Sequence, residues 1–261
     1  MGLMDRKLGL GLAVLMFLGT GCSSLRYKKT EDLWTESDQK FKAGQYGDAV
    51  PYYDELLRRN DEDSRARFYR AVSKDRSGAT TDALDDYQRA ADGGQAKALL
   101  WRAGLDVKSG FYDAAERDLQ ALRGAQLQTS DQVAQLTVIG DLRLKQNNPR
   151  LAVQSLERAT ELAKSQSDSE TLGHARNAHY NAANAYYLLG EFQSAMEHME
   201  QYRQISETTG AGLEGKDYSM LCLTHYLSGD MDGARQYVNK CDPEWRKKAA
   251  QDFGDTAFFG S

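Results

Sequence analysis

The sequence has little proline and few residues that could do chemistry. It contains three prolines, three cysteines and four histidines in 261 residues. Scarce proline favours helices, because proline in a helix interior removes a backbone hydrogen bond. No glycine-rich phosphate loop and no Ser/His/Asp set is visible. The four histidines are His174, His179, His198 and His225. None is separated from a second His, Cys or carboxylate by a spacing typical of metal ligands. We therefore predict neither an enzyme nor a cofactor.

The chain also lacks an excess of positive charge. It has 33 Lys and Arg against 38 Asp and Glu, for a net charge of −5. No basic stripe appears, which argues against nucleic acid as a partner. Charged residues are 27% and hydrophobic residues 41% of the chain, the balance of a soluble globular protein. Its length exceeds that of a typical single-core domain, but a repeat array can absorb such length.

Long apolar runs are absent except near the start. Residues 8–18 form an uncharged apolar run that follows the basic residues Arg6 and Lys7. The run is too short to span a bilayer as a helix, but it fits the hydrophobic region of an export signal. Small residues at Gly19 and Gly21 satisfy the ordinary leader-peptidase rule. We therefore predict an export signal over residues 1–21.

The residue directly after this segment is Cys22. A cysteine at this place resembles the bacterial lipoprotein signal, although the usual leucine three residues before it is here Leu18, four before. The resemblance implies that Cys22 becomes the mature N-terminus and carries acyl chains such as palmitate. Ser23 in the next position implies the outer membrane, facing the periplasm. The alternative is an ordinary secreted protein that begins with cysteine. Residues 22–30 read as a tether.

The rest of the chain repeats a short element at intervals of 32 to 43 residues. The element is glycine, any residue, an aromatic or apolar residue, two further residues and alanine, as in 44–49, 110–115, 190–195 and 229–234. Looser copies occupy 78–83 and 147–152. Each Gly or Asn is expected to end one helix and each following segment to begin the next. The aligned alanines are Ala49, Ala83, Ala115, Ala152, Ala195 and Ala234.

Two further positions recur relative to each alanine. Twelve residues before it the side chain is small: Ser37, Ala71, Ala103, Gly140, Ala183 and Cys222. Four residues after it the side chain is bulky: Tyr53, Tyr87, Leu119, Leu156, Met199 and Val238. Small residues let antiparallel helices approach closely, and the i, i+4 stripe is typical of a packed helix.

This pattern closely resembles the tetratricopeptide repeat. The resemblance covers residues 31–242 in six copies and implies an all-α solenoid of about six antiparallel helix pairs. The proline that often closes each repeat is absent from most copies. Residues 243–261 follow the last copy, with Trp245, Ala249 and Phe253 on one helix face. We expect a C-terminal capping helix there, which covers the end of the array, followed by a tail that packs or is disordered.

The resemblance also implies a binding surface, because in this family the first helix of each repeat lines a concave groove. Repeat five carries the sharpest pattern: Asn177, Asn181 and Asn184 lie at i, i+4 and i+7 of one helix. Asparagine is a poor helix former, so three on one face need a reason, and their amides can pair with an extended peptide backbone. The alternative is that they pair with neighbouring helices. The other predicted protein-binding residues are aromatic: Trp34, Phe41, Phe68, Tyr180, Tyr187 and Tyr226.

Two cysteines remain, Cys222 and Cys241, both in repeat six. Buried thiols are the simplest expectation, but an exported protein could pair them as a disulfide.

The predicted function is a protein-binding scaffold of the bacterial cell envelope. Its partners would be envelope proteins or peptides, and a lipid would attach it to the membrane. Assembly of an outer-membrane machine, similar in architecture to pilotins or to barrel-assembly lipoproteins, is one role. An adaptor for peptidoglycan-remodelling enzymes is the alternative.

Overall fold

The computed structural model describes residues 24–260, and every regular element within that range is helical. The first half contains α2 (Thr30–Lys42), α3 (Tyr46–Arg59), α4 (Ser64–Arg76), α5 (Thr80–Asp92), α6 (Lys97–Ser109) and α7 (Tyr112–Ala121). The second contains α8 (Thr129–Lys145), α9 (Pro149–Ala163), α10 (Ser169–Leu189), α11 (Phe192–Thr209), α12 (Gly215–Ser228), α13 (Met231–Tyr237), the 3₁₀ turn η1 (Val238–Lys240), α14 (Pro243–Asp252) and α15 (Thr256–Phe259). The predicted all-α fold of six helix pairs and a capping helix is confirmed.

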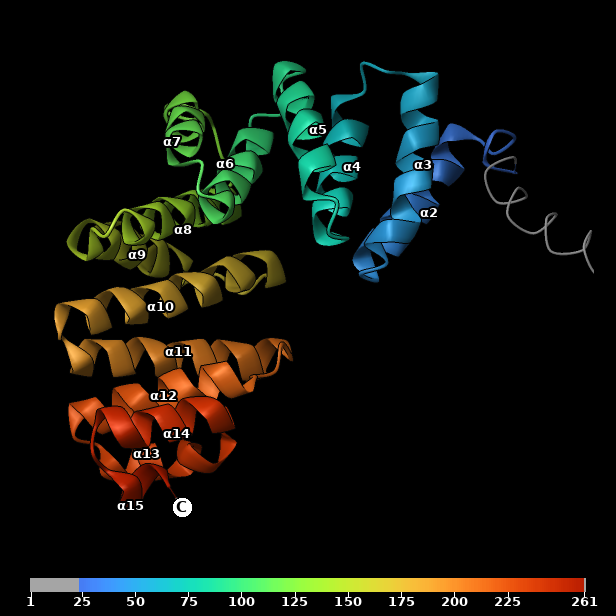
Figure 1. Cartoon of the computed structure of the whole chain (residues 1–261). Coiled ribbons are helices and arrows are strands. Elements are labelled where there is room, and N and C mark those ends of the chain that lie inside the picture. The colour runs from blue at the N-terminus through green and yellow to red at the C-terminus, as the bar shows by residue number, and fades with distance from the viewer. Residues whose placement is uncertain (1–23, 261) are drawn as a thin grey trace, which may run out of the picture. The chain divides into compact units, whose positions relative to one another are not determined.

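The chain divides into two compact units, one ending at Leu105 and the other beginning at Asp106. In the first unit, the fully buried Tyr53 and Tyr87 lie in two adjoining hydrophobic clusters built from α2 to α6. In the second unit, α8 to α13 stack in chain order (Figure 1). One of its clusters joins α8 to α11 and the other joins α10 to the C-terminal helices.

The repeat register read from the sequence is confirmed at every copy. All six aligned alanines are 0% exposed. The small residues twelve positions earlier and the bulky residues four positions later are all buried as well. Burial of these three positions in each repeat means that the same contact between helices recurs along the chain.

Gly140 shows why one of these positions must be small. A Cβ atom added to this glycine would lie 2.4 Å from Cγ of Leu156, a fully buried side chain of the paired helix α9. The two helices therefore meet with no room for even a methyl group.

The turns between paired helices depend on left-handed backbone. Gly190, the C-cap of α10, has φ of 76° and its amide donates to the carbonyl of Tyr187. Asn147 occupies the corresponding place after α8 with φ of 57°. Asparagine tolerates this conformation better than most residues, which explains its appearance in a copy that lacks the glycine.

The C-terminal segment packs against the last repeat as predicted. Ala249 of α14 is 4% exposed, and Trp245 packs against the same cluster. The tail forms α15, in which Phe258 and Phe259 are buried. The tail is thus part of the core of the second unit.

The predicted export signal and Cys22 lie outside the described residues. Within residues 24–260, no helix combines the length and the hydrophobicity that a membrane span requires.

Gly140→Ala tests the close approach of α8 and α9. We expect a loss of about 1–3 kcal/mol in the free energy of unfolding, because the methyl group overpacks Leu156. Gly173→Ala is the matched control: it lies within α10, has ordinary helical backbone, and a Cβ there meets no atom within 4 Å. The control should stabilise by about 0.5–1 kcal/mol. Urea unfolding of both variants measures the difference, and equal effects would contradict this account.

Candidate functional site

The asparagine face of α10 is the first candidate, and we define it as Asn177, Asn181, Asn184 and Tyr187. Asn177 is exposed and the other three are half-buried. No side-chain hydrogen bond joins the three asparagines to another described residue, so their donors and acceptors are not used within the part of the chain that the structure describes. The ring of Tyr187 contacts that of Phe192, with 6.1 Å between centroids. The structure therefore brings these four residues to one accessible helix face.

Two predicted aromatic residues of the same unit have internal partners. Tyr180 is half-buried against Tyr202, and burial raises the pKa of its hydroxyl. Tyr226 contacts the rings of the C-terminal tail, at 4.9 Å from Phe259, and its hydroxyl donates to Asp255. Tyr226 is half-buried, as Tyr187 is, and its role as a contact to a partner stays a prediction.

Phe68 requires a correction. It was expected in a groove, but it is 3% exposed and lies in the core of the first unit against Tyr87 and Trp101. The next residue, Tyr69, takes its place at the surface and contacts both Trp34 and Phe41. The repeat register of α4 holds, but Phe68 was wrongly assigned to its groove-facing side.

A cation lies over this aromatic surface. The guanidinium of Arg65 is 4.2 Å from the ring centroid of Trp34 and 5.7 Å from that of Tyr69. Arg65 also pairs loosely with Asp38, at 3.7 Å. Arg65 and Tyr69 are four residues apart, a spacing that places both on one helix face and that could have indicated this surface from the sequence.

Cys222 and Cys241 are buried, and their thiols are free in this structure. A hydrogen bond between the two side chains, together with burial, raises the pKa of Cys222. The sulfur of Cys241 also donates to the carbonyl of Tyr237 at 3.3 Å. The two thiols lie close enough to hydrogen-bond. Their pairing as a disulfide in an oxidising compartment stays a prediction.

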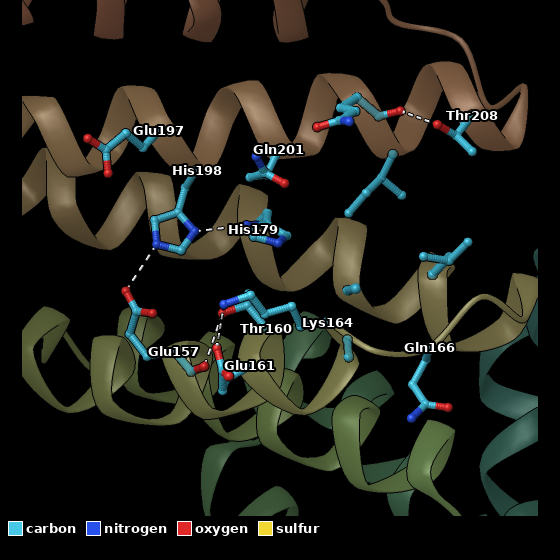
Figure 2. A pocket seen from close by; sticks show the side chains of 15 residues that line it. Glu157, Thr160, Glu161, Lys164, Gln166, His179, Glu197, His198, Gln201 and Thr208 are labelled. Carbon is cyan, nitrogen blue, oxygen red and sulfur yellow. Dashed lines mark hydrogen bonds and ion pairs between the residues drawn. The ribbon is translucent and has the colours of Figure 1, made fainter.

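A groove of about 620 Å³ lies between α9 and α11, with the first half of α10 as its floor (Figure 2). Its floor is apolar, with Leu172 and Ala175 of α10. Its walls are polar and include Glu157 and Glu161 of α9 and Gln201 of α11. The groove lies wholly within the second unit.

Two histidines meet at this groove, as Figure 2 shows. Nδ1 of His179 lies 2.9 Å from Nδ1 of His198, whose Nε2 lies 3.0 Å from Oε1 of Glu157. The hydroxyl of Tyr186 donates to the same carboxylate oxygen at 2.6 Å. Burial, followed by the neighbouring His198, lowers the pKa of His179 to about 4. Sequence spacing did not reveal this pair, although each histidine lies within four residues of a repeat position, the small Ala183 or the aligned Ala195.

His225 has the opposite surroundings. Its Nε2 is 2.9 Å from Glu200 and its Nδ1 is 2.7 Å from Asp230, so a carboxylate accepts from each ring nitrogen. Burial alone would lower the pKa of His225, but the two carboxylates outweigh burial and raise it. The hydrogen bond from His225 in turn lowers the pKa of Glu200 to about 2. The imidazolium therefore joins α12 to α11 and to the N-cap of α13.

These clusters do not form a metal centre among residues 24–260: no three His, Cys, Asp or Glu side chains there are placed to hold an ion.

Comparison with known proteins identifies the repeat. The family model described as tetratricopeptide repeat matches residues 35–98 and 137–208, slightly more than half of the chain. No curated protein matches the sequence.

Several solved structures share the fold. The structure of pilF from Pseudomonas aeruginosa is 14% identical with a TM-score of 0.63, over 92% of this chain and 97% of that one. PilW, described as a widely conserved type IV pilus biogenesis factor, is 15% identical with a TM-score of 0.64, over 88% and 96%. A tetratricopeptide repeat protein from Parabacteroides merdae is 16% identical with a TM-score of 0.59, over 81% and 77%. At these identities the likeness shows the fold alone.

The His225 cluster makes stability depend on pH. The folded pKa lies above the ordinary value of 6.5, so its contribution is complete below about pH 6.5 and is lost as the pH rises through the folded pKa. We expect His225→Gln to cost about 2 kcal/mol at about pH 6 and less at alkaline pH. Urea unfolding of both proteins across this range measures the difference. A cost that does not change with pH would contradict a charged His225.

Proposed function

Because this chain belongs to the tetratricopeptide repeat family, we propose that it is a scaffold of the bacterial cell envelope that captures an extended segment of a partner protein on the asparagine face of α10. Members of this family bind proteins or peptides, which makes this chain a protein-interaction scaffold. The kind of partner, the cell envelope as the compartment and the asparagine face as the binding surface are what we propose.

The observation that carries the proposal is the set of three unused amides on α10. Asparagine costs helix stability relative to alanine, and here no hydrogen bond to another described residue offsets that cost. Each amide offers two donors and an acceptor, which match the alternating groups of an extended backbone. Tyr187 lies beside them with a half-buried ring, the kind of rigid contact that is enriched at interfaces.

The envelope location rests on the N-terminal sequence. A basic start, the apolar run over residues 8–18 and Cys22 after Gly21 support export followed by lipid attachment. Several acyl chains on one N-terminus would hold the protein firmly at a membrane. Likeness in fold to pilF and PilW over nearly their whole lengths is consistent with a role in assembling a pilus or a similar envelope machine.

Asn181→Ala combined with Tyr187→Ala tests the binding face. The partner is first captured with the mature protein from envelope extract and identified by mass spectrometry. We expect the double variant to bind that partner about tenfold more weakly, because two contact groups are removed from an accessible surface. The melting temperature should change little, since neither residue is fully buried.

The matched control is Gln154→Ala with Arg158→Ala, two exposed residues of the neighbouring helix α9, which lie off α10 altogether. It should bind normally. If the Asn181/Tyr187 double variant captures the partner as well as the wild type does, the asparagine face is not the binding site. Recovery of cell-wall hydrolases in place of pilus proteins would redirect the proposal to a different envelope partner.

Cys22→Ala tests the anchor. We expect the wild-type protein to sediment with membranes and the variant to appear in the soluble envelope fraction, because no acyl chain can attach to alanine. Mass spectrometry of the N-terminal peptide should show acyl groups on the wild type. A wild-type peptide without lipid would show that the protein is secreted but not anchored.

A further inference from the structure

Three helices of the first unit, α2, α4 and α6, place aromatic side chains in contact with one another. Trp34 of α2 and Tyr69 of α4 are both half-buried, and their ring centroids are 6.5 Å apart. Phe68 continues the row, because its ring lies 5.4 Å from that of Tyr69 and 6.3 Å from that of Trp101. Trp101 of α6 is again half-buried. A row of rings therefore joins the three helices.

Cations lie over the half-buried rings of this row. Besides Arg65, which covers Trp34 and Tyr69, the ammonium group of Lys97 is 5.9 Å from the ring centroid of Tyr69. The guanidinium of Arg76 is 5.7 Å from that of Trp101. All these distances are within the range of a cation–π contact. We define the cation–aromatic surface by three rings and three cations: Trp34, Tyr69, Trp101, Arg65, Arg76 and Lys97.

Part of this surface recurs with the repeat. Arg65 precedes Tyr69 by four residues on α4, and Lys97 precedes Trp101 by four residues on α6. Each member of the first pair lies 32 residues before its counterpart in the second, which is also the separation of the aligned Ala83 and Ala115. A cation one helical turn before an aromatic residue is therefore placed at the same position in two consecutive repeats.

The three cations have little negative charge near them. Lys97 and Arg76 form no ion pair with another described residue. Arg65 is 3.7 Å from Asp38, but the two side chains are 55% and 37% exposed, so this pair is weak and easily exchanged. Three positive charges thus face one loosely held carboxylate, on a chain whose net charge is −5.

The remaining basic residues of α4 have a different use. Three of them form ion pairs with the buried carboxylate of Asp86 on α5: Arg67, Arg70 and Lys74. These pairs hold α4 to its partner helix. Arg65 and Arg76 are not needed for that contact, and both are exposed.

We propose that the cation–aromatic surface binds an extended acidic segment of a partner protein. Carboxylates pair with a guanidinium through two parallel hydrogen bonds, and a ring beneath the cation reduces the freedom that the cation loses on binding. Charge complementarity selects an acidic segment, since each cation is open to a carboxylate of the partner. This inference rests on the role of the chain as a protein-interaction scaffold, but it does not depend on the asparagine face, which belongs to the other unit.

Single-stranded nucleic acid is the other kind of polyanion that combines with basic and aromatic residues. Its bases stack on open ring faces. Here the guanidinium of Arg65 lies only 4.2 Å from the ring centroid of Trp34 and so occupies a face that a base would need. Three cations are also few for a phosphate backbone. The geometry therefore favours carboxylates.

The three tryptophans of the chain allow a direct test. Trp34 and Trp101 lie in the cation–aromatic surface, whereas Trp245 is half-buried in the other unit and serves as an internal control. The mature protein, labelled with ¹⁵N in the indole groups, is titrated with the probe peptide acetyl-Glu-Gly-Glu-Gly-Glu-amide. We expect the indole signals of Trp34 and Trp101 to shift and that of Trp245 to stay in place. The same peptide with glutamine for glutamate should shift none of them.

Charge removal provides the second measurement. Arg65→Gln with Lys97→Gln should weaken binding of the glutamate peptide about fivefold, because two exposed ion pairs are lost. The matched control, Arg58→Gln with Arg89→Gln, removes the same two charges from exposed positions on α3 and α5 and should bind normally. Asn181→Ala with Tyr187→Ala should also leave this titration unchanged, so failure of the asparagine face would not be confused with failure of this surface.

Four results would overturn the proposal. The first is the absence of any shift of Trp34 and Trp101 with millimolar peptide, and the second is an equal shift of Trp245. The third is equal weakening by the two double glutamine variants, which would indicate attraction to overall charge. The fourth is a short thymidine oligonucleotide that shifts the same two signals at lower concentration than the peptide, which would identify nucleic acid as the ligand.

Discussion

Close contact between the two helices of each repeat is the constraint on which the other features depend. The contact exists because one position on the first helix is always small and its counterparts on the second helix are alanine and a bulky residue, all buried. Gly140 and Leu156 show how closely the two helices approach, since no Cβ atom fits between these residues. Such packing removes apolar surface from water in every repeat and leaves the outward sides of each helix open to other side chains.

The polar clusters of the second unit are consequences of that contact. His179 lies four residues before the small Ala183, and His198 lies three residues after Ala195. Helices that approach closely there bring the two rings within hydrogen-bonding distance and partly bury them. One repeat later, His225 is placed between carboxylates, and the same burial has the opposite result because two negative charges outweigh it. His179 is thereby favoured in its neutral form, whereas the two carboxylates favour the charged form of His225.

The helix α10 is the element where structure and proposed function meet. It separates an amide face, suited to a peptide backbone, from the groove whose polar walls come from α9 and α11. A helix of 21 residues is long enough to carry both surfaces. Its own packing needs only the alanines between the two surfaces, such as Ala178, Ala182 and Ala185, all of which are fully buried. The asparagines, which do not pack, are thus available for binding.

Local pattern alone determined the helix pairs, their register and the capping helix, because each depends on the spacing of small and bulky residues within one repeat. The asparagine stripe was also visible, since three residues at helical spacing share a face whatever surrounds them. Only the tertiary structure decided which aromatic residues are exposed. Phe68 and Tyr69 are adjacent in sequence but lie on different sides of α4. The packing of α4 against its neighbours decides which of the two is buried. The ring of Tyr226 packs against a tail that lies about thirty residues further along the chain. The histidine pair joins residues 19 apart on different helices, so its contact depends on a distance that sequence spacing does not contain.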